Sequence, residues 1–213
     1  MAQIYLNKVR SVLCLGAHSD DIEIGCGGAI LTLARKHPDL TVCWVVFTAD
    51  GRRQAEAKKS ARAFLRNAGK SQVIIKQFRN GYFPFEGASI KDFFESLKSQ
   101  IQPDLVFTHF RDDRHQDHRL ISDLTWNTFR SHLIFEYEIP KYDGDIGSPN
   151  FFVPLSKQVA MAKANNLCRF FSTQNNKHWF DQDTFLALMR LRGIESCSKY
   201  AEAFYVRKMV YGF

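Results

Sequence analysis

Groups that can bind a metal or move a proton stand close together near the start of the chain. His18, Asp20 and Asp21 follow the apolar run at residues 12–16 and precede the small-residue segment at 25–28. A carboxylate without a partner is costly to bury, so polar groups at the end of a buried strand indicate a role beyond packing. Imidazole nitrogens and carboxylate oxygens are ligands that a catalytic divalent metal uses.

A second polar segment lies about a hundred residues further on. Residues 111–118 follow another apolar run at 105–107 and contain His115, Asp117 and His118. Open α/β sheets bind ligands at the carboxyl ends of their strands, where two such segments can converge. Together the segments predict a metal site, whereas either one alone would also fit a capping and hydrogen-bond cluster without metal.

Strand and helix patterns alternate through the first half of the chain, which indicates βαβ units and a parallel sheet. Near-continuous apolar runs such as residues 40–47 are typical of strands buried on both faces. We therefore predict an α/β, Rossmann-like fold with a mostly parallel sheet flanked by helices, with residues 1–213 as a single domain. The expected strands are 9–16, 40–47, 73–75 and 105–108, and the expected helices are 22–36, about 52–67, 89–101 and 119–130.

The second half of the chain is less regular, and we expect it to complete the same core and to shape the rim of a pocket. Residues 141–149 are rich in Gly, Asp and Pro and predict a loop. The remaining expected elements are a strand at 133–139, helices at 156–171 and 183–191, and a final strand at 203–210.

Composition narrows the class of protein. The 213 residues are 45% hydrophobic, which is typical of a globular chain. The net charge of +7 comes from scattered residues, without the stripe or module of nucleic-acid proteins, so we expect no nucleic-acid partner. The positive net charge is also compatible with a preference for an anionic substrate, which stays open.

Cysteine use and hydropathy indicate the compartment. The chain has five cysteines, an odd number, and none of them forms a Cys-x-x-Cys pair. A disulfide framework is therefore not expected, which favours a reduced, cytoplasmic setting. No apolar stretch approaches the roughly 18 residues of a membrane span. Residues 1–8 lack the apolar core of a signal peptide.

The two segments together resemble the paired signature of the PIG-L/LmbE-like zinc deacetylases, whose motifs are Ala-His-Pro-Asp-Asp and His-x-Asp-His. Gly27 and Gly28, the Arg53-x-x-Glu56 pattern and residues 200–204 extend the similarity. The resemblance implies a Rossmann-like fold and hydrolysis of an N-acetyl group from an amino sugar or sugar conjugate. Ser19 replaces the proline of the first motif, which removes a fixed φ angle but no ligand.

The resemblance implies a metal and the residues that hold it. His18, Asp21 and His118 correspond to the three zinc ligands of the family. Two imidazoles and one carboxylate around an open position are a common catalytic zinc set. Such a set also binds Fe(II), Co(II) or Ni(II), so the native metal stays open.

The resemblance also implies catalytic roles. Asp20 corresponds to the general base, and His115 to the group that stabilises the tetrahedral oxyanion and can protonate the leaving amine. Asp117 corresponds to a carboxylate that orients or tunes an imidazole. Arg53 matches a substrate-contacting arginine, although the neighbouring Arg52 leaves that choice open.

Several alternatives remain at this point. The same metal site can serve the hydration of a small unsaturated acid, or the chain can be a non-catalytic carbohydrate-binding module. The substrate depends on loops at residues 80–87 and 141–149. Asp113 can contact the substrate or His115, and His109 is expected to be structural rather than a ligand. Relatives are often oligomers, and a homo-oligomer is a further open expectation.

Overall fold

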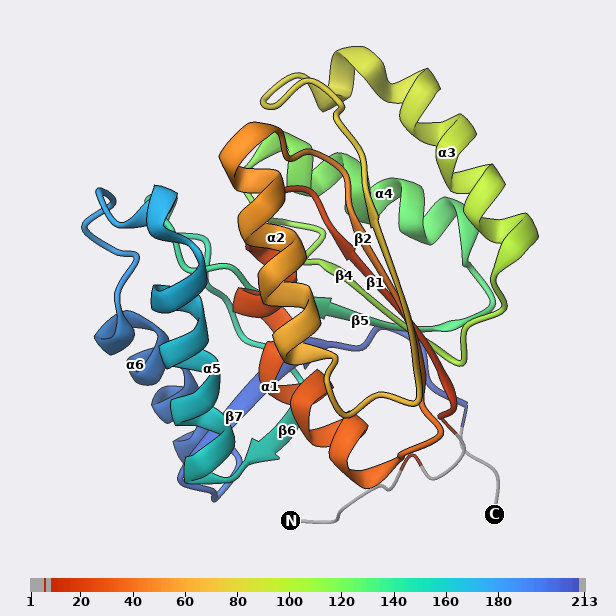
Figure 1. Cartoon of the computed structure of the whole chain (residues 1–213). Helices are drawn as coiled ribbons and strands as arrows, with labels where there is room; N and C mark the ends of the chain where they lie inside the picture. The colour runs from red at the N-terminus through yellow and green to blue at the C-terminus, as the bar shows by residue number, and fades with distance from the viewer. Residues whose placement is uncertain (1–5, 7–8, 211–213) are drawn as a thin grey trace.

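The computed structural model describes residue 6 and residues 9–210, and in this part of the chain a seven-stranded sheet lies between two layers of helices (Figure 1). The strands are β1 (Ser11–Gly16), β2 (Thr41–Val46), β3 (Lys70–Ile75), β4 (Leu105–His109), β5 (Leu133–Tyr137), β6 (Phe151–Leu155) and β7 (Tyr200–Tyr205). The helices are α1 (Asp21–Lys36), α2 (Gly51–Phe64), α3 (Gly87–Gln100), α4 (Gln116–Thr128), α5 (Lys157–Phe170) and α6 (Gln182–Glu195), with short 3-10 helices η1 (Phe83–Glu86) and η2 (Ser172–Gln174).

The sheet has the strand order β3-β2-β1-β4-β5-β7-β6, and its first five strands run parallel. The α/β, Rossmann-like fold with a mostly parallel sheet is thereby confirmed. From β1 the chain moves outward to β2 and β3, and then returns to place β4 on the other side of β1. Folds of this kind bind ligands where the strand order reverses, which here is at the carboxyl ends of β1 and β4.

The far edge of the sheet is antiparallel and departs from the sequence prediction. β7 pairs antiparallel with β5 and β6, and the predicted final strand at 203–210 is wrong in its bounds by several residues. The prediction missed β6 because Pro154 lies within it. Proline is tolerated there because β6 is an edge strand, where one backbone N–H has no ladder partner to lose.

Alternating side chains divide the core between the two faces of the sheet. Val12 and Cys14 of β1 face one cluster with α1, α2, α5 and α6, whereas Leu13 and Leu15 face the other with α3 and α4. This alternation is the two-residue period of a strand, and both faces are apolar because both carry helices.

The small residues at the start of α1 allow that helix to lie close against its neighbours, as predicted. A Cβ atom on Gly25 would lie 2.1 Å from the ring of Tyr137, and one on Gly27 would lie 2.6 Å from the ring of Phe64. Real Cβ atoms do not approach other atoms so closely, so a larger residue at Gly25 would push α1 away from the sheet and one at Gly27 would push it away from α2.

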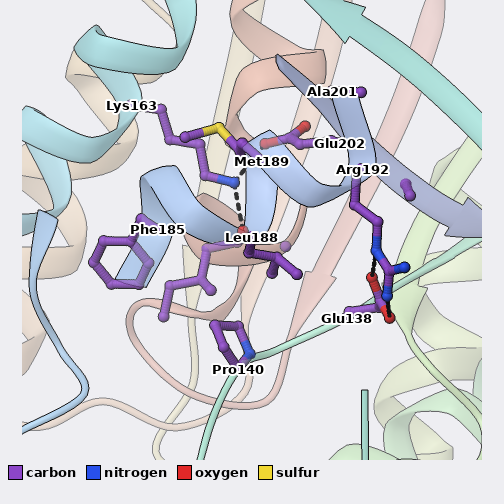
Figure 2. Close-up of a pocket in the computed structure, with 12 residues that line it drawn as sticks. Glu138, Pro140, Lys163, Phe185, Leu188, Met189, Arg192, Ala201 and Glu202 are labelled. Atoms are coloured by element: carbon purple, nitrogen blue, oxygen red, sulfur yellow. Dashed lines mark hydrogen bonds and ion pairs between the residues drawn. The ribbon is translucent and has the colours of Figure 1, made fainter. Parts of the chain in front are cut away.

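Two buried ion pairs line a pocket between α1, α6 and β7 (Figure 2). Lys163 Nζ lies 2.6 Å from Glu202 Oε1 and also donates to the carbonyl of Ile24. Arg192 Nη2 lies 2.7 Å from Glu138 Oε1. Each charge in this pocket therefore has an opposite charge beside it.

No helix within residues 9–210 is both long enough and apolar enough to cross a membrane. The prediction about a signal peptide concerns residues 1–8, of which only residue 6 is among the described residues. That residues 1–213 make up one domain stays a prediction.

Candidate active site

The first polar segment connects β1 to α1, and the second connects β4 to α4. His18 lies in the turn after β1, Asp21 is the first residue of α1, and His118 is in the first turn of α4. The predicted helix at 119–130 in fact begins at Gln116. β1 and β4 are neighbours in the sheet, so residues a hundred positions apart meet at the switch point of the strand order.

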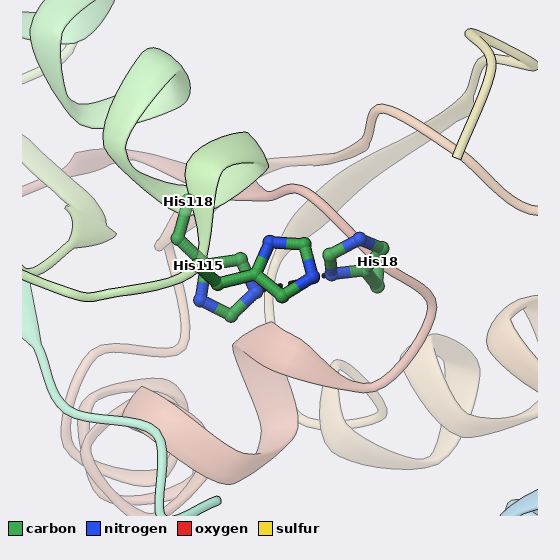
Figure 3. Close-up of side chains that lie close together, drawn as sticks. All are labelled: His18, His115 and His118. Atoms are coloured by element: carbon green, nitrogen blue, oxygen red, sulfur yellow. Dashed lines mark hydrogen bonds between the residues drawn. The ribbon is translucent and has the colours of Figure 1, made fainter. Parts of the chain in front are cut away.

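Donor atoms of His18, Asp21 and His118 form a small triangle. His18 Nδ1 lies 3.0 Å from His118 Nε2 and 3.2 Å from Asp21 Oδ2, and His118 Nε2 lies 3.5 Å from Asp21 Oδ2. Figure 3 shows the imidazole of His118, at the start of α4, directed toward that of His18. Tetrahedral ligands about 2.0–2.2 Å from a zinc ion are roughly 3.3–3.5 Å from one another, so the triangle fits a divalent ion.

Two further imidazoles border this triangle. His18, His115 and His118 form one group with ligand atoms close enough to hold an ion, and Asp21, His109 and His118 form a second. His109 Nε2 lies 3.2 Å from Asp21 Oδ2 and accepts a hydrogen bond from the amide of Ala17. The triangle above combines members of both groups, and His109 and His115 are the neighbouring side chains.

Burial and neighbouring charges shift the pKa values of the triangle residues in different directions. Burial alone would lower the pKa of His18, but the Asp21 and Asp117 carboxylates more than offset this and raise it to about 10. Burial and the nearby His109 lower the pKa of His118 to about 3. Burial would raise the pKa of Asp21, yet His118, His109 and His18 hold it well below its usual range.

Asp20 is buried beside Asp21 and caps no amide of α1 with its side chain. Burial and the charge of Asp21 raise its pKa to about 6, while Lys177 and Arg53 act in the opposite direction. A carboxyl group with a pKa near the working pH can accept and return a proton more readily than an ordinary aspartate.

The backbone fixes the orientation of His115. This residue precedes α4, and its Nδ1 accepts a hydrogen bond of 3.2 Å from the amide of Asp117. The neutral ring must then carry its proton on Nε2, which leaves an N–H donor free on the other side. Burial and the charge of His18 lower the pKa of His115, which favours this neutral form.

The carboxylate of Asp117 contacts His18, while its backbone amide contacts the ring of His115. Its Oδ2 lies 3.3 Å from His18 Nε2, and the carboxylate also accepts hydrogen bonds from the amides of Gly81 and Phe83. It therefore connects one imidazole of the triangle to residues 80–87, as expected of a carboxylate that orients an imidazole; the predicted loop there contains the 3-10 helix η1.

The two neighbouring arginines of α2 face different surroundings. Arg52 donates to Ser172 Oγ and lies 3.8 Å from Glu56, which also binds Thr173. Arg53, in contrast, is close enough to lower the pKa of Asp20. Of the two, Arg53 is the one whose charge acts on the candidate base.

The sequence analysis understated two residues that the structure brings to the site. His109 ends β4 beside Asp21, and Asp113 accepts a hydrogen bond of 2.9 Å from His118 Nδ1. His109 ends β4, next to the end of β1, and this position could have indicated that it belongs to the site. Nothing in the spacing of residues 111–118 distinguishes Asp113 from the exposed Asp112.

With this geometry in view, comparison with known proteins identifies the family. A family model described as GlcNAc-PI de-N-acetylase (PIG-L) matches residues 13–129, which is more than half of the chain. The chain belongs to this family of deacetylases. A protein named uncharacterized deacetylase YaiS, from Escherichia coli (strain K12), is 31% identical over 145 residues, covering 63% of this chain and 76% of YaiS.

Solved structures share the fold at lower identity. An N,N'-diacetylchitobiose deacetylase from Pyrococcus horikoshii is 21% identical with a TM-score of 0.72, over 93% of this chain and 84% of that one. GalB, a 4-carboxy-2-hydroxymuconate hydratase from Pseudomonas putida KT2440, is 15% identical with a TM-score of 0.74, over 96% and 98% of the two chains. One architecture thus serves both a deacetylase and a hydratase.

Proposed function

We propose that this protein is a metal-dependent hydrolase that removes the N-acetyl group of an amino sugar or sugar conjugate. The observation that carries the proposal is the triangle of His18 Nδ1, Asp21 Oδ2 and His118 Nε2, with sides of 3.0–3.5 Å. Membership of the PIG-L family supports the reaction class.

These residues would hold the metal, with Zn(II) as the first candidate and Fe(II) as an alternative. A divalent ion held there supplies a Lewis acid for the amide carbonyl and lowers the pKa of water toward 7. With two imidazoles and one carboxylate as its protein ligands, such an ion would keep a position for water, as in catalytic rather than structural zinc sites.

The protein's own groups would move the protons and stabilise the developing charge. Asp20, whose pKa is raised to about 6, would take the proton of the attacking water. His115, with its Nδ1 occupied by the amide of Asp117, would donate from Nε2 to the oxyanion of the tetrahedral intermediate. The proton that Asp20 takes from the water would then pass to the leaving amine, since a neutral His115 would become an imidazolate if it gave up its own. Asp117 would keep His18 in place through its 3.3 Å contact.

The substrate would meet Arg53 and the loops at residues 80–87 and 141–149. A positive charge from Arg53 beside Asp20 favours a conjugate with an anionic group, such as a phosphate or carboxylate. A cytoplasmic location and a homo-oligomeric state remain predictions.

Acetate release from a panel of N-acetyl sugars, presented free, nucleotide-linked and lipid-linked, tests the proposal. The metal-loaded protein should release acetate from at least one of them, and the chelator-treated protein should not. The competing reaction is tested in parallel with 4-carboxy-2-hydroxymuconate, whose hydration changes its ultraviolet absorbance. Hydration of this acid, with no acetate from the whole panel, would replace the deacetylase assignment with the hydratase one.

A further inference from the structure

The carboxylate of Asp113 is buried at 2% exposure and receives hydrogen bonds on both of its oxygens. Oδ1 accepts from the amide of His115 at 2.7 Å, and Oδ2 accepts from His118 Nδ1 at 2.9 Å. Lys141 Nζ lies 3.0 Å from the same Oδ2. With two N–H groups and the ammonium of Lys141 directed at it, the carboxylate of Asp113 acts as an acceptor on both oxygens.

This contact decides which nitrogen of His118 can bind a metal. Because Nδ1 donates its proton to Asp113, the neutral ring has its lone pair on Nε2, the atom that points at His18 Nδ1 and Asp21 Oδ2. A carboxylate behind a metal-binding imidazole fixes the ring orientation and raises its basicity.

The chain of contacts continues from Asp113 to the loop at residues 141–149. Lys141 is 7% exposed and lies 2.5 Å from Asp145 Oδ2, which accepts from the amide of Arg114 at 2.7 Å. The loop therefore folds back onto the segment that carries Asp113.

The other end of the same loop is held by a separate ion pair. Arg192 donates to the carbonyl of Gly147 at 2.9 Å, and the amide of Gly147 donates to Glu138. Between these two attachments Tyr142 is exposed, with its ring 5.2 Å from that of His178. The loop thus presents side chains to solvent from a backbone tied down at both ends.

We propose that Asp113 is a positioning residue for His118, and that Lys141 links it to the loop at residues 141–149. The inference rests on the proposed function, in which His118 binds the metal and that loop meets the substrate. The series of contacts from His118 through Asp113 to Lys141 then affects both the metal affinity and how well ordered the substrate-facing loop is.

Metal affinity tests the first half of this inference without any activity assay. Competition with a chelator for Zn(II), at fixed pH, should show about 10–100-fold weaker binding for Asp113→Asn, the range for loss of such a carboxylate. Asp113→Glu, which keeps the charge, should recover part of the loss. Asp112→Asn is the matched control, because Asp112 is the preceding residue and its side chain is 73% exposed. Affinity of Asp113→Asn within twofold of the unmodified protein would overturn the role.

Nitrogen-detected NMR of the imidazoles tests the same point in the unmodified protein and so does not depend on the folding of a variant. His118 should carry its proton on Nδ1, both without metal and with Zn(II) bound. A proton on Nε2 in the metal-free protein would overturn the inference. The acetate assay is independent of this result, so failure of the deacetylase assignment and failure of the Asp113 role are distinguishable.

Hydrogen exchange tests the link to the loop. In Lys141→Met, amides within residues 141–149 and the amide of Arg114 should exchange about tenfold faster, because the loop opens more often once its charge-assisted contacts are lost. Asp143→Asn should leave the exchange unchanged, because Asp143 is partly exposed and lies 3.9 Å from Lys141 Nζ. Unchanged exchange in Lys141→Met would overturn the link.

Discussion

Two buried charged regions of this protein differ in how their polar atoms are paired. In the pocket between α1, α6 and β7, Lys163 meets Glu202 at 2.6 Å, and both side chains are under 5% exposed. In the candidate metal site, Asp21 and His118 are buried to a similar degree, at 5% and 2% exposure. Burial therefore does not distinguish the two regions.

The pairing of the atoms does distinguish them. Glu202 accepts hydrogen bonds from Lys163 and from the amides of Gly28 and Ala29, so its charge is fully compensated within the fold. In the candidate metal site, two imidazole nitrogens and a carboxylate oxygen lie 3.0–3.5 Å from one another, and all three can present lone pairs to an ion once His18 is neutral. A cation can take the place of the proton of His18 among these three atoms, whereas the Lys163–Glu202 pair is complete as it stands.

The largest expected effect follows from removing one of the converging lone pairs. Purified without added metal, the unmodified protein should contain about one equivalent of a divalent ion by elemental analysis. His118→Ala should lose most of it, with an affinity at least about 10³-fold weaker, because two ligands cannot hold an ion as three do. His37→Ala, at the end of α1, is the control. Full metal retention in both His118→Ala and His18→Ala would contradict the assignment.

In the paired region, breaking a charge pair should reduce stability and leave the metal in place. Lys163→Met leaves Glu202 buried without its counter-charge, which should lower the free energy of unfolding by about 3–5 kcal/mol. Chemical denaturation measures this, with the exposed Lys157→Met of the same helix as the control. A metal content that falls with Lys163→Met would show that the two regions are not independent.

Within the candidate metal site, replacing the base should lower the activity but not the metal content, whereas replacing a ligand should lower both. Asp20→Asn should keep its metal while kcat falls at least about 10²-fold, the range for general-base catalysis. Steady-state kinetics and elemental analysis of the same sample make the comparison. Loss of metal together with activity would instead make Asp20 a ligand or a structural residue.

His115 should affect the reaction more than substrate binding. As an oxyanion donor it acts mainly in the transition state, so His115→Ala should lower kcat by about 10²–10³-fold with little change in KM. An unchanged kcat in the metal-loaded variant would refute the role and favour the hydration reaction.

The smallest expected effect is the release of a proton when the metal binds. Without metal, the raised pKa of His18, about 10, keeps its imidazole protonated at pH 8, whereas a ligand must be neutral. Zinc binding at pH 8 should therefore release about one proton, and the affinity should rise with pH until about 10. Titration calorimetry in buffers of different ionisation enthalpy measures the release, and none at pH 8 would contradict the raised pKa.

Much of the parallel half of the fold could be predicted, because buried parallel strands have continuous apolar runs that the sequence shows directly. The strand at residues 40–47 and the helix at 22–36 are close to β2 and α1 as observed. The antiparallel edge was harder to predict, since Pro154 hides β6 and pairing with β5 and β6 sets the bounds of β7.

The sequence by itself determined the types of ligand and the strand ends that carry them, because apolar runs followed by His and Asp are visible without coordinates. Only the tertiary structure decided how the side chains are oriented. It places Asp113 behind His118, while Asp112 faces solvent, and it ties Lys141 to that carboxylate. Side-chain direction in a turn depends on which neighbouring strand and loop pack against it, and residue spacing along the chain does not contain that information.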